Sequence, residues 1–152
     1  AKSAIMEEAF DFWIPYLATN FVALLLLYVC IKWYKAGRIT FGIIFLIAAG
    51  INAFTAINKP AAYLAYEKYT LLDFYEAFIT GFFARNTTMI VLSIALGQLL
   101  IAAGLLFFRK WTRTAAAGAM AFLIAIAPLG FGSAFPASLI MALAVFMIWR
   151  KT

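Results

Sequence analysis

Residues 58–88 read NKPAAYLAYEKYTLLDFYEAFITGFFARNTT, and they separate one apolar block, at about 12–57, from another, at about 89–150. The stretch holds three of the six acidic residues and a dense set of Tyr and Phe. Wound as a helix at about 100° per residue, its second half carries large apolar side chains on one face: Leu71, Phe74, Tyr75, Phe78 and Phe82. We therefore predict that residues 69–83 form an amphipathic helix that lies in the membrane interface.

The composition of the whole chain is that of a membrane protein. Of its 152 residues, 67% are hydrophobic and 12% are charged, and the mean hydropathy is +1.01. A soluble domain is about half apolar and about a quarter charged, and a core of this size cannot remove so much apolar surface from water. We expect an all-α fold, a single polytopic helix bundle over residues 1–152 whose solvent is the lipid bilayer.

The apolar segments predict five transmembrane helices, at about 12–31, 39–57, 89–108, 111–129 and 135–149. A membrane span needs about 20 apolar residues, and residues 114–149 are too many for one helix. Pro128 and Pro136, with two glycines between them, divide that segment. The alternative is a four-span protein in which both prolines stand inside one long helix.

Small residues recur at helical spacing on two of the predicted spans. On the second span they are Gly42, Ala49, Ala53 and Ala56. On the third span they are Ser93, Gly97 and Gly104. Because small side chains let helix backbones approach closely in a membrane, we predict that both faces are helix-packing seams.

When five spans are assumed, the basic and acidic residues are distributed unequally between the two sides of the membrane. One side collects eight basic residues and no acidic residue: Lys32, Lys35, Arg38, Arg109, Lys110, Arg113, Arg150 and Lys151. The other four basic residues fall on the opposite side with all six acidic residues. The positive-inside rule then places the amino terminus and residues 58–88 outside and the carboxyl terminus in the cytoplasm. The net charge of +6 is thus interpreted as a topology signal of a prokaryotic plasma (inner) membrane protein, with no nucleic acid as partner.

The residue types exclude several kinds of chemistry. The chain has no histidine and a single cysteine, Cys30. Haem held by histidine, the usual zinc and copper sites, Ser-His and Cys-His catalysis and an internal disulfide are therefore excluded. We assign no catalytic residue, no metal ligand and no covalent cofactor. Whether the protein is an enzyme stays open, and the sequence favours a chain without activity of its own.

Away from the ends of the predicted spans, the polar side chains are few and uncharged, among them Asn20, Asn52, Gln98, Thr19, Thr55 and Ser93. For the amides, hydrogen bonding between helices is favoured over contact with a ligand. The outer half of the membrane nevertheless gathers the elements of a quinone or lipid pocket: Asn52, Asn58, Tyr63, Tyr66 and Arg85. A quinone ring would stack on the aromatic rings, and its carbonyl oxygen would accept from Tyr, Asn or Arg. The alternative, which we favour, is an aromatic belt beside a solvated acidic face.

Several short motifs carry a family resemblance. They include Gly37-Arg38, FLIAAGINAF at 45–54, GLLFFR at 104–109 and TRTAA at 112–116. With them, the chain from Gly37 onward resembles the DoxX-like family of small membrane proteins. The resemblance implies a four-helix unit made of spans two to five, with the first span as an added N-terminal helix. Ala53 stands where the family often has histidine, and Ser93 stands where it often has glutamate.

Three functions fit these features. The first is a non-catalytic integral subunit of a larger membrane complex, respiratory or redox-linked, with other membrane subunits as partners. The second is a quinone- or lipid-binding oxidoreductase component of the DoxX-like type, since the family is linked to quinone-dependent thiosulfate oxidation and to complexes that handle oxidative stress. The third is a small-molecule transporter, against which the lack of charge in the middle of the predicted spans argues.

Overall fold

The computed structural model describes the backbone of all residues except 1, 62, 64–72 and 128–135, and the side chains of all residues except these and 2–13, 73, 74 and 76. The described part of the chain is helical and contains no strand, which confirms the all-α prediction. Three helices are long: α1 (Lys2–Lys32), α2 (Tyr34–Asn58) and α4 (Thr87–Leu106). The others are α3 (Asp73–Phe78), the π-helical turn η2 (Ile79–Phe83), the 3-10 turn η3 (Arg109–Trp111), α5 (Thr112–Ile126) and α6 (Ala137–Lys151).

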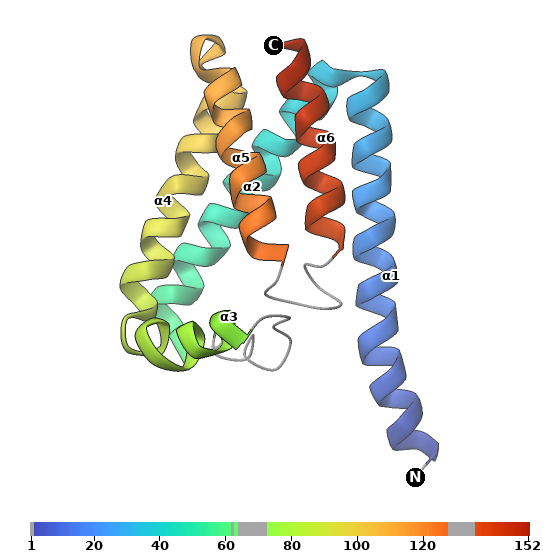
Figure 1. Ribbon diagram of the computed structural model, residues 1–152, viewed down its shortest axis with the longest axis vertical. Helices are drawn as coiled ribbons and strands as arrows, with labels where there is room; N and C mark the ends of the chain where they lie inside the picture. Colours follow the sequence, from blue (N-terminus) through green and yellow to red (C-terminus); the bar gives the residue numbers. More distant parts are fainter. Residues whose placement is uncertain (1, 62, 64–72, 128–135) are drawn as a thin grey trace.

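Figure 1 shows α1, α2, α4, α5 and α6 running along the long axis of the molecule, whereas α3 lies across one end of the bundle. Helix α2 packs mainly against α4, whereas α6 packs against both α1 and α5. The last helix therefore stands beside the first, although the two are far apart in the sequence. The carboxyl terminus lies at the end of the bundle where α2 begins (Figure 1).

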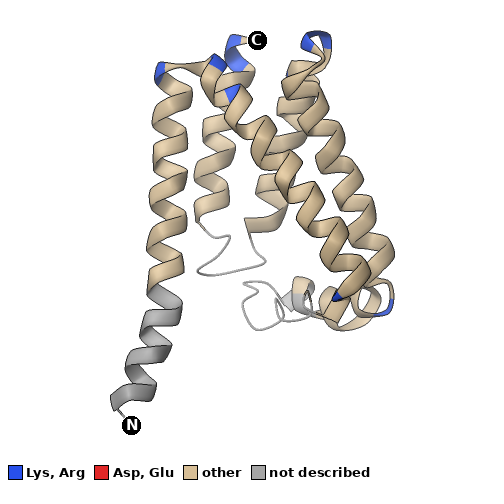
Figure 2. Cartoon of the chain, turned by 180° about the vertical axis from the view of Figure 1, so that it is seen from behind, with Lys and Arg blue, Asp and Glu red and all other residues tan. Residues whose placement is uncertain are grey.

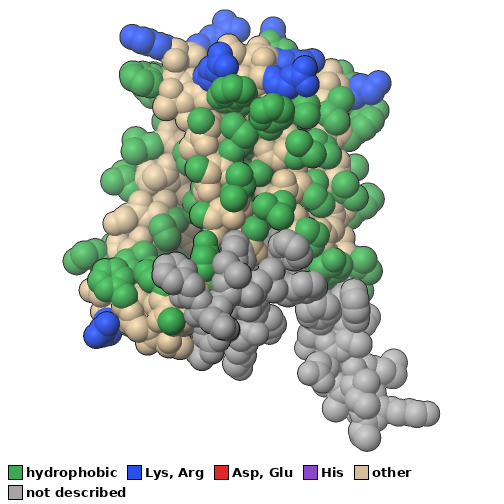
Figure 3. All heavy atoms as spheres, in the orientation of Figure 1, with side chains coloured by type: hydrophobic (Ala, Val, Ile, Leu, Met, Phe, Trp, Pro, Cys, Tyr) green, Lys and Arg blue, Asp and Glu red, His purple; other side chains and the backbone are tan. Residues whose placement is uncertain are grey.

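The surface of the long helices is apolar along most of their length. Phe21 on α1, Ile51 on α2 and Leu100 on α4 are 63%, 60% and 64% exposed. Hydrophobic side chains cover the flank of the bundle, and lysine and arginine gather at its end (Figure 3). Exposing so many large apolar side chains to water would be unfavourable, so this surface indicates a multi-pass protein embedded in a lipid bilayer.

Three helical segments are long and apolar enough to cross a membrane: Ile14–Lys32, Tyr34–Asn58 and Thr87–Leu106. They correspond to the first three predicted spans, although α1 begins at Lys2 rather than at residue 12. Helices α5 and α6 have 15 residues each. At 1.5 Å per residue each is about 22 Å long, which is less than the hydrocarbon thickness of about 30 Å. Of the two prolines predicted to divide these helices, Pro136 directly precedes α6, and Pro128 lies outside the described residues together with 129–135.

The core between the helices is made largely of small residues. The predicted seam on α2 is confirmed for three of its four residues, since Gly42, Ala49 and Ala56 are buried, Ala53 is half-buried, and α4 is the main neighbour of this helix. The seam predicted on α4 is wrong for two of its three residues. Gly104 is buried, and a Cβ added there would lie 2.6 Å from the Cβ of Ala115, whereas Ser93 is exposed and Gly97 has open space around it.

The physical reason is that α2 and α5 contact different sides of α4. The side chains that α4 buries are Thr87, Val91, Ala95, Gln98, Ala102 and Leu105, a face displaced from Ser93 and Gly97. Only near its carboxyl end does α4 turn Gly104 toward α5, because the short turn through η3 brings the two helices together there.

The part of the predicted amphipathic helix that the structure describes, residues 73–83, is helical throughout. It consists of α3 and the wide turn η2, and residues 69–72 lie outside the described part. Phe78 and Phe82, from the predicted apolar face, are exposed, whereas Ile79 and Phe83 are buried. A π-helical turn holds more residues per turn than an α-helix, so it changes which side chains point inward. The hydroxyl of Tyr75 donates to the carbonyl of Ala125 at 2.9 Å and ties α3 to the end of α5.

The basic residues whose side chains the structure describes are divided between the two ends of the bundle (Figure 2). The turn between α1 and α2, the turn between α4 and α5, and the last turn of α6 meet at one end. These three places carry the eight basic residues that the sequence assigned to one side. Lys59 follows the other end of α2, and Arg85 precedes α4.

Candidate functional site

A cluster of neutral polar groups lies between α2 and α4. The side-chain amide of Asn52 donates from Nδ2 to Oε1 of Gln98 at 2.8 Å. Gln98 is only 3% exposed, although it stands in the middle of an apolar helix. This contact confirms the interpretation that these two amides serve hydrogen bonding between helices.

Tyr63, which follows the end of α2, completes this cluster. Its hydroxyl donates to Oδ1 of Asn52 at 2.9 Å and lies 3.2 Å from the main-chain carbonyl of Asn52. Both polar atoms of the Asn52 side chain are therefore engaged. We call Asn52, Tyr63 and Gln98 the amide–tyrosine cluster.

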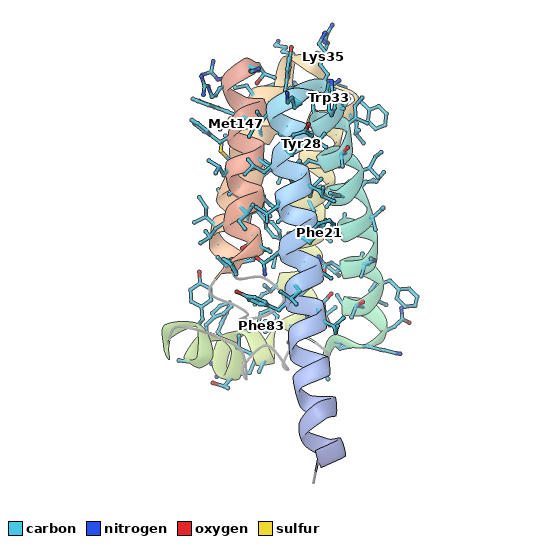
Figure 4. All side chains as sticks on the ribbon, turned by 90° about the vertical axis from the view of Figure 1, so that its right-hand side faces the viewer. Phe21, Tyr28, Trp33, Lys35, Phe83 and Met147 are labelled. Atoms are coloured by element: carbon cyan, nitrogen blue, oxygen red, sulfur yellow. The ribbon has the colours of Figure 1, made fainter. Side chains whose placement is uncertain are left out.

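Aromatic and aliphatic side chains pack against Tyr63 of the amide–tyrosine cluster. The rings of Tyr63 and Phe83 meet edge to face, with centroids 6.4 Å apart and an angle of 81°. The ring centroids of Phe83 and Phe78 are 5.7 Å apart. Ile79 and Val91 are buried in the same hydrophobic group, against which Tyr63 packs. Figure 4 shows Phe83 at the end of the bundle opposite Lys35 and Trp33.

The remaining residues of the predicted pocket are placed differently. Asn58 donates from Nδ2 to the carbonyl of Phe54 in its own helix at 2.9 Å, and its side chain is exposed. Arg85 is exposed beyond η2, and Tyr66 lies outside the described residues. The structure thus brings together Asn52 and Tyr63 but directs Asn58 elsewhere. The quinone or lipid pocket stays a prediction.

The sequence did not include Gln98 or Phe83 in the candidate pocket, although both contact it. Gln98 did carry a signal, because a single amide in an apolar span needs a hydrogen-bonding partner. Phe83 carried none, because its inward direction depends on the π-helical turn. At the opposite end of the bundle, the sequence pattern indicated only a role in membrane topology for Lys35, Arg38, Arg109 and Lys151.

A groove of about 450 Å³ runs between α4 and α5. It is lined mainly by apolar side chains, among them Leu100, Ile101, Phe108 and Trp111. None of the residues of the amide–tyrosine cluster borders it. Among the residues that the structure describes, no group of three or more histidine, cysteine or acidic side chains could hold a metal ion.

The chemistry open to the amide–tyrosine cluster is limited. The side-chain amides of Asn52 and Gln98 do not titrate, so neither can act as a general acid or base near neutral pH. They can donate and accept hydrogen bonds, and they can fix the segment after α2 against α4. Comparison with family models, with curated proteins and with solved structures finds no match to this chain.

Proposed function

We propose that this protein is a non-catalytic integral subunit of a larger, redox-linked membrane complex. The observation that carries the proposal is the amide–tyrosine cluster, whose polar groups bond to one another inside the bundle rather than pointing into a reaction space. Hydrogen bonds between neutral groups of two helices stabilise one arrangement of those helices. The amide–tyrosine cluster is therefore suited to a structural role in an assembly.

Open glycine positions on the outer faces of two helices support the same proposal. A Cβ added at Gly50 on α2 or at Gly97 on α4 would meet nothing within 4 Å. These glycines therefore do not serve packing within the described chain. In membranes, small residues at helix surfaces allow a second helix to approach closely, so both positions suit contact with another subunit.

Native mass spectrometry of the protein purified from its own membranes in mild detergent tests this proposal. We expect partner proteins to co-purify, and we expect Gly50→Leu and Gly97→Leu to reduce their recovery by blocking close approach. Ala117→Leu, at an exposed position on α5, serves as the control for added bulk. A chain that is monomeric in every preparation, with unchanged composition in all three variants, would contradict the proposal.

The five-span topology belongs to this proposal. In this topology, α5 and α6 would belong to two further membrane spans, predicted at about 111–129 and 135–149. Residues 58–88 would lie outside. In a Cys30→Ala background, Ser133→Cys should react with a membrane-impermeant maleimide in intact cells, as should the outer reference Arg85→Cys. Arg150→Cys should react only after lysis. Labelling of Ser133→Cys only after lysis would support three spans with a hairpin that does not cross.

A second candidate is a quinone- or lipid-binding oxidoreductase component of the DoxX-like type. It is favoured by the half-buried Tyr63, which stands between an amide and an aromatic ring. Solvent extraction of the purified protein should then release stoichiometric quinone, and Tyr63→Ala or Asn52→Ala should lower the amount. Equal recovery from the exposed control Tyr28→Ala and from Tyr63→Ala would remove the support for this site.

A further inference from the structure

Three separate parts of the chain enclose a polar cleft of about 240 Å³ at the end of the bundle where α2 begins. The start of α2 contributes Lys35 and Arg38, the junction of η3 and α5 contributes Arg109 and Thr112, and the carboxyl end of the chain contributes Lys151 and Thr152. We call this the basic cleft. Figure 2 shows the lysine and arginine positions at this end, and Figure 3 shows their side chains gathered there.

The walls of the basic cleft are held by specific contacts. Arg38 donates from Nη1 to the carbonyl of Leu105 at the carboxyl end of α4. The ammonium group of Lys151 lies 5.8 Å from the centre of the Tyr34 ring, which links α6 to α2. Thr112 is buried, and its hydroxyl donates to the carbonyl of Gly104 at 3.0 Å. The cationic groups therefore converge from elements that are anchored to one another.

No carboxylate among the described side chains balances these charges. Every acidic residue of the chain belongs to residues 1–13 or 58–88. Helix α1 starts, and α2 ends, at the end of the bundle opposite the basic cleft (Figure 1). Four cationic side chains around one small space repel one another, and an anion placed among them removes that repulsion.

We propose that the basic cleft binds a phosphate group. A guanidinium offers paired donors that match phosphate oxygens, and a lysine ammonium adds a compact positive charge. The exposed Trp33 and Trp111 flank this end of the bundle, and tryptophan is enriched at the level of lipid headgroups. The phosphate can come from an anionic lipid headgroup or from inorganic phosphate in solution, since both present the same oxygens.

The test compares two variants of equal net charge in the full-length protein. Lys35→Gln with Arg109→Gln removes two charges from the basic cleft and leaves the contact between Arg38 and Leu105 in place. Lys110→Gln with Arg150→Gln removes two charges from the same end of the bundle, at residues that do not line the cleft. Helical content and thermal unfolding in detergent check that both variants fold.

Binding is measured by native mass spectrometry of delipidated protein with phosphatidylglycerol or with phosphatidylcholine of the same acyl chains. We expect the natural sequence and the control variant to prefer phosphatidylglycerol, and the cleft variant to bind it about thirtyfold more weakly, as follows from two near-surface cations. The same samples are titrated with inorganic phosphate and followed by ³¹P NMR.

Each outcome has a defined meaning. A preference for phosphatidylglycerol that only the cleft variant loses supports a lipid headgroup as the ligand. Binding of inorganic phosphate that only the cleft variant loses, without a lipid preference, supports phosphate from solution. Equal losses in both variants would show an effect of net charge alone, and they would overturn the proposal, as would the absence of both kinds of binding in the natural sequence.

Discussion

The side chains of Asn52 and Gln98 are joined by a hydrogen bond of 2.8 Å across the contact between α2 and α4. The two residues are 46 positions apart in the sequence, and Gln98 is buried. Gln98 is buried in an apolar helix, where an amide without a hydrogen-bonding partner is unfavourable, so this residue depends on its bond to Asn52. The pair thereby sets how α2 and α4 lie along one another.

We predict that Gln98→Leu lowers the free energy of unfolding by about 1–2 kcal/mol, because the Nδ2 group of Asn52 loses its acceptor. The double variant Asn52→Leu with Gln98→Leu should lose less than the sum of the two single variants, since the partner left unpaired is also removed. Reversible unfolding in detergent gives all three values. Asn58→Leu, whose amide is exposed, is the control and should change stability by less than about 0.5 kcal/mol. Strict additivity would show that the two amides do not depend on each other.

The hydroxyl of Tyr63 should matter separately from its ring. Tyr63→Phe removes the donor to Asn52 but keeps the edge-to-face contact with Phe83, and we expect it to cost about 0.5–1.5 kcal/mol. Tyr63→Ala also removes the ring and should cost more. The same unfolding assay measures both variants, with the exposed Tyr28→Phe as a reference. If Tyr63→Phe behaves like Tyr28→Phe, the hydroxyl contributes nothing to the stability of the bundle.

The turn between α1 and α2 requires a glycine at position 37. A Cβ added there would lie 2.4 Å from Sγ of Cys30 and 3.2 Å from its Cα. We predict that Gly37→Ala destabilises the protein by about 1–3 kcal/mol, because a buried sulfur must move. In the double variant Cys30→Ala with Gly37→Ala, the nearest atom is gone, and part of the loss should be recovered. Failure to recover any stability would place the strain in the backbone instead of the sulfur.

The two glycines in the apolar body of α4 should respond in opposite directions. Gly104→Ala would bring its Cβ to 2.6 Å from that of Ala115 and should separate α4 from α5, with a loss of about 1–3 kcal/mol. Gly97→Ala meets open space and should stabilise the helix by about 0.5–1 kcal/mol, because alanine loses less backbone freedom than glycine. Thermal unfolding in detergent distinguishes them. A loss of stability in Gly97→Ala would show that the predicted seam on α4 is used after all.

The sequence by itself determined that the fold is all-α, that lipid surrounds it and where the second helix ends. The apolar composition could not be buried in a chain of 152 residues, and the second predicted span, at about 39–57, ends within one residue of the end of α2 at Asn58. The positions of Gly42, Ala49 and Ala56 also predicted correctly which face of α2 packs. These features could be predicted because they depend on composition and on spacing within one helix.

Only the tertiary structure decided which faces meet. It joined Asn52 to Gln98, placed α6 beside α1, left Gly97 open and turned Phe83 inward through the π-helical turn. It also drew Lys35, Arg38, Arg109 and Lys151 around one cleft. The physical reason is that periodicity defines a face of a helix but not its partner, which depends on how the side chains of distant segments fit together.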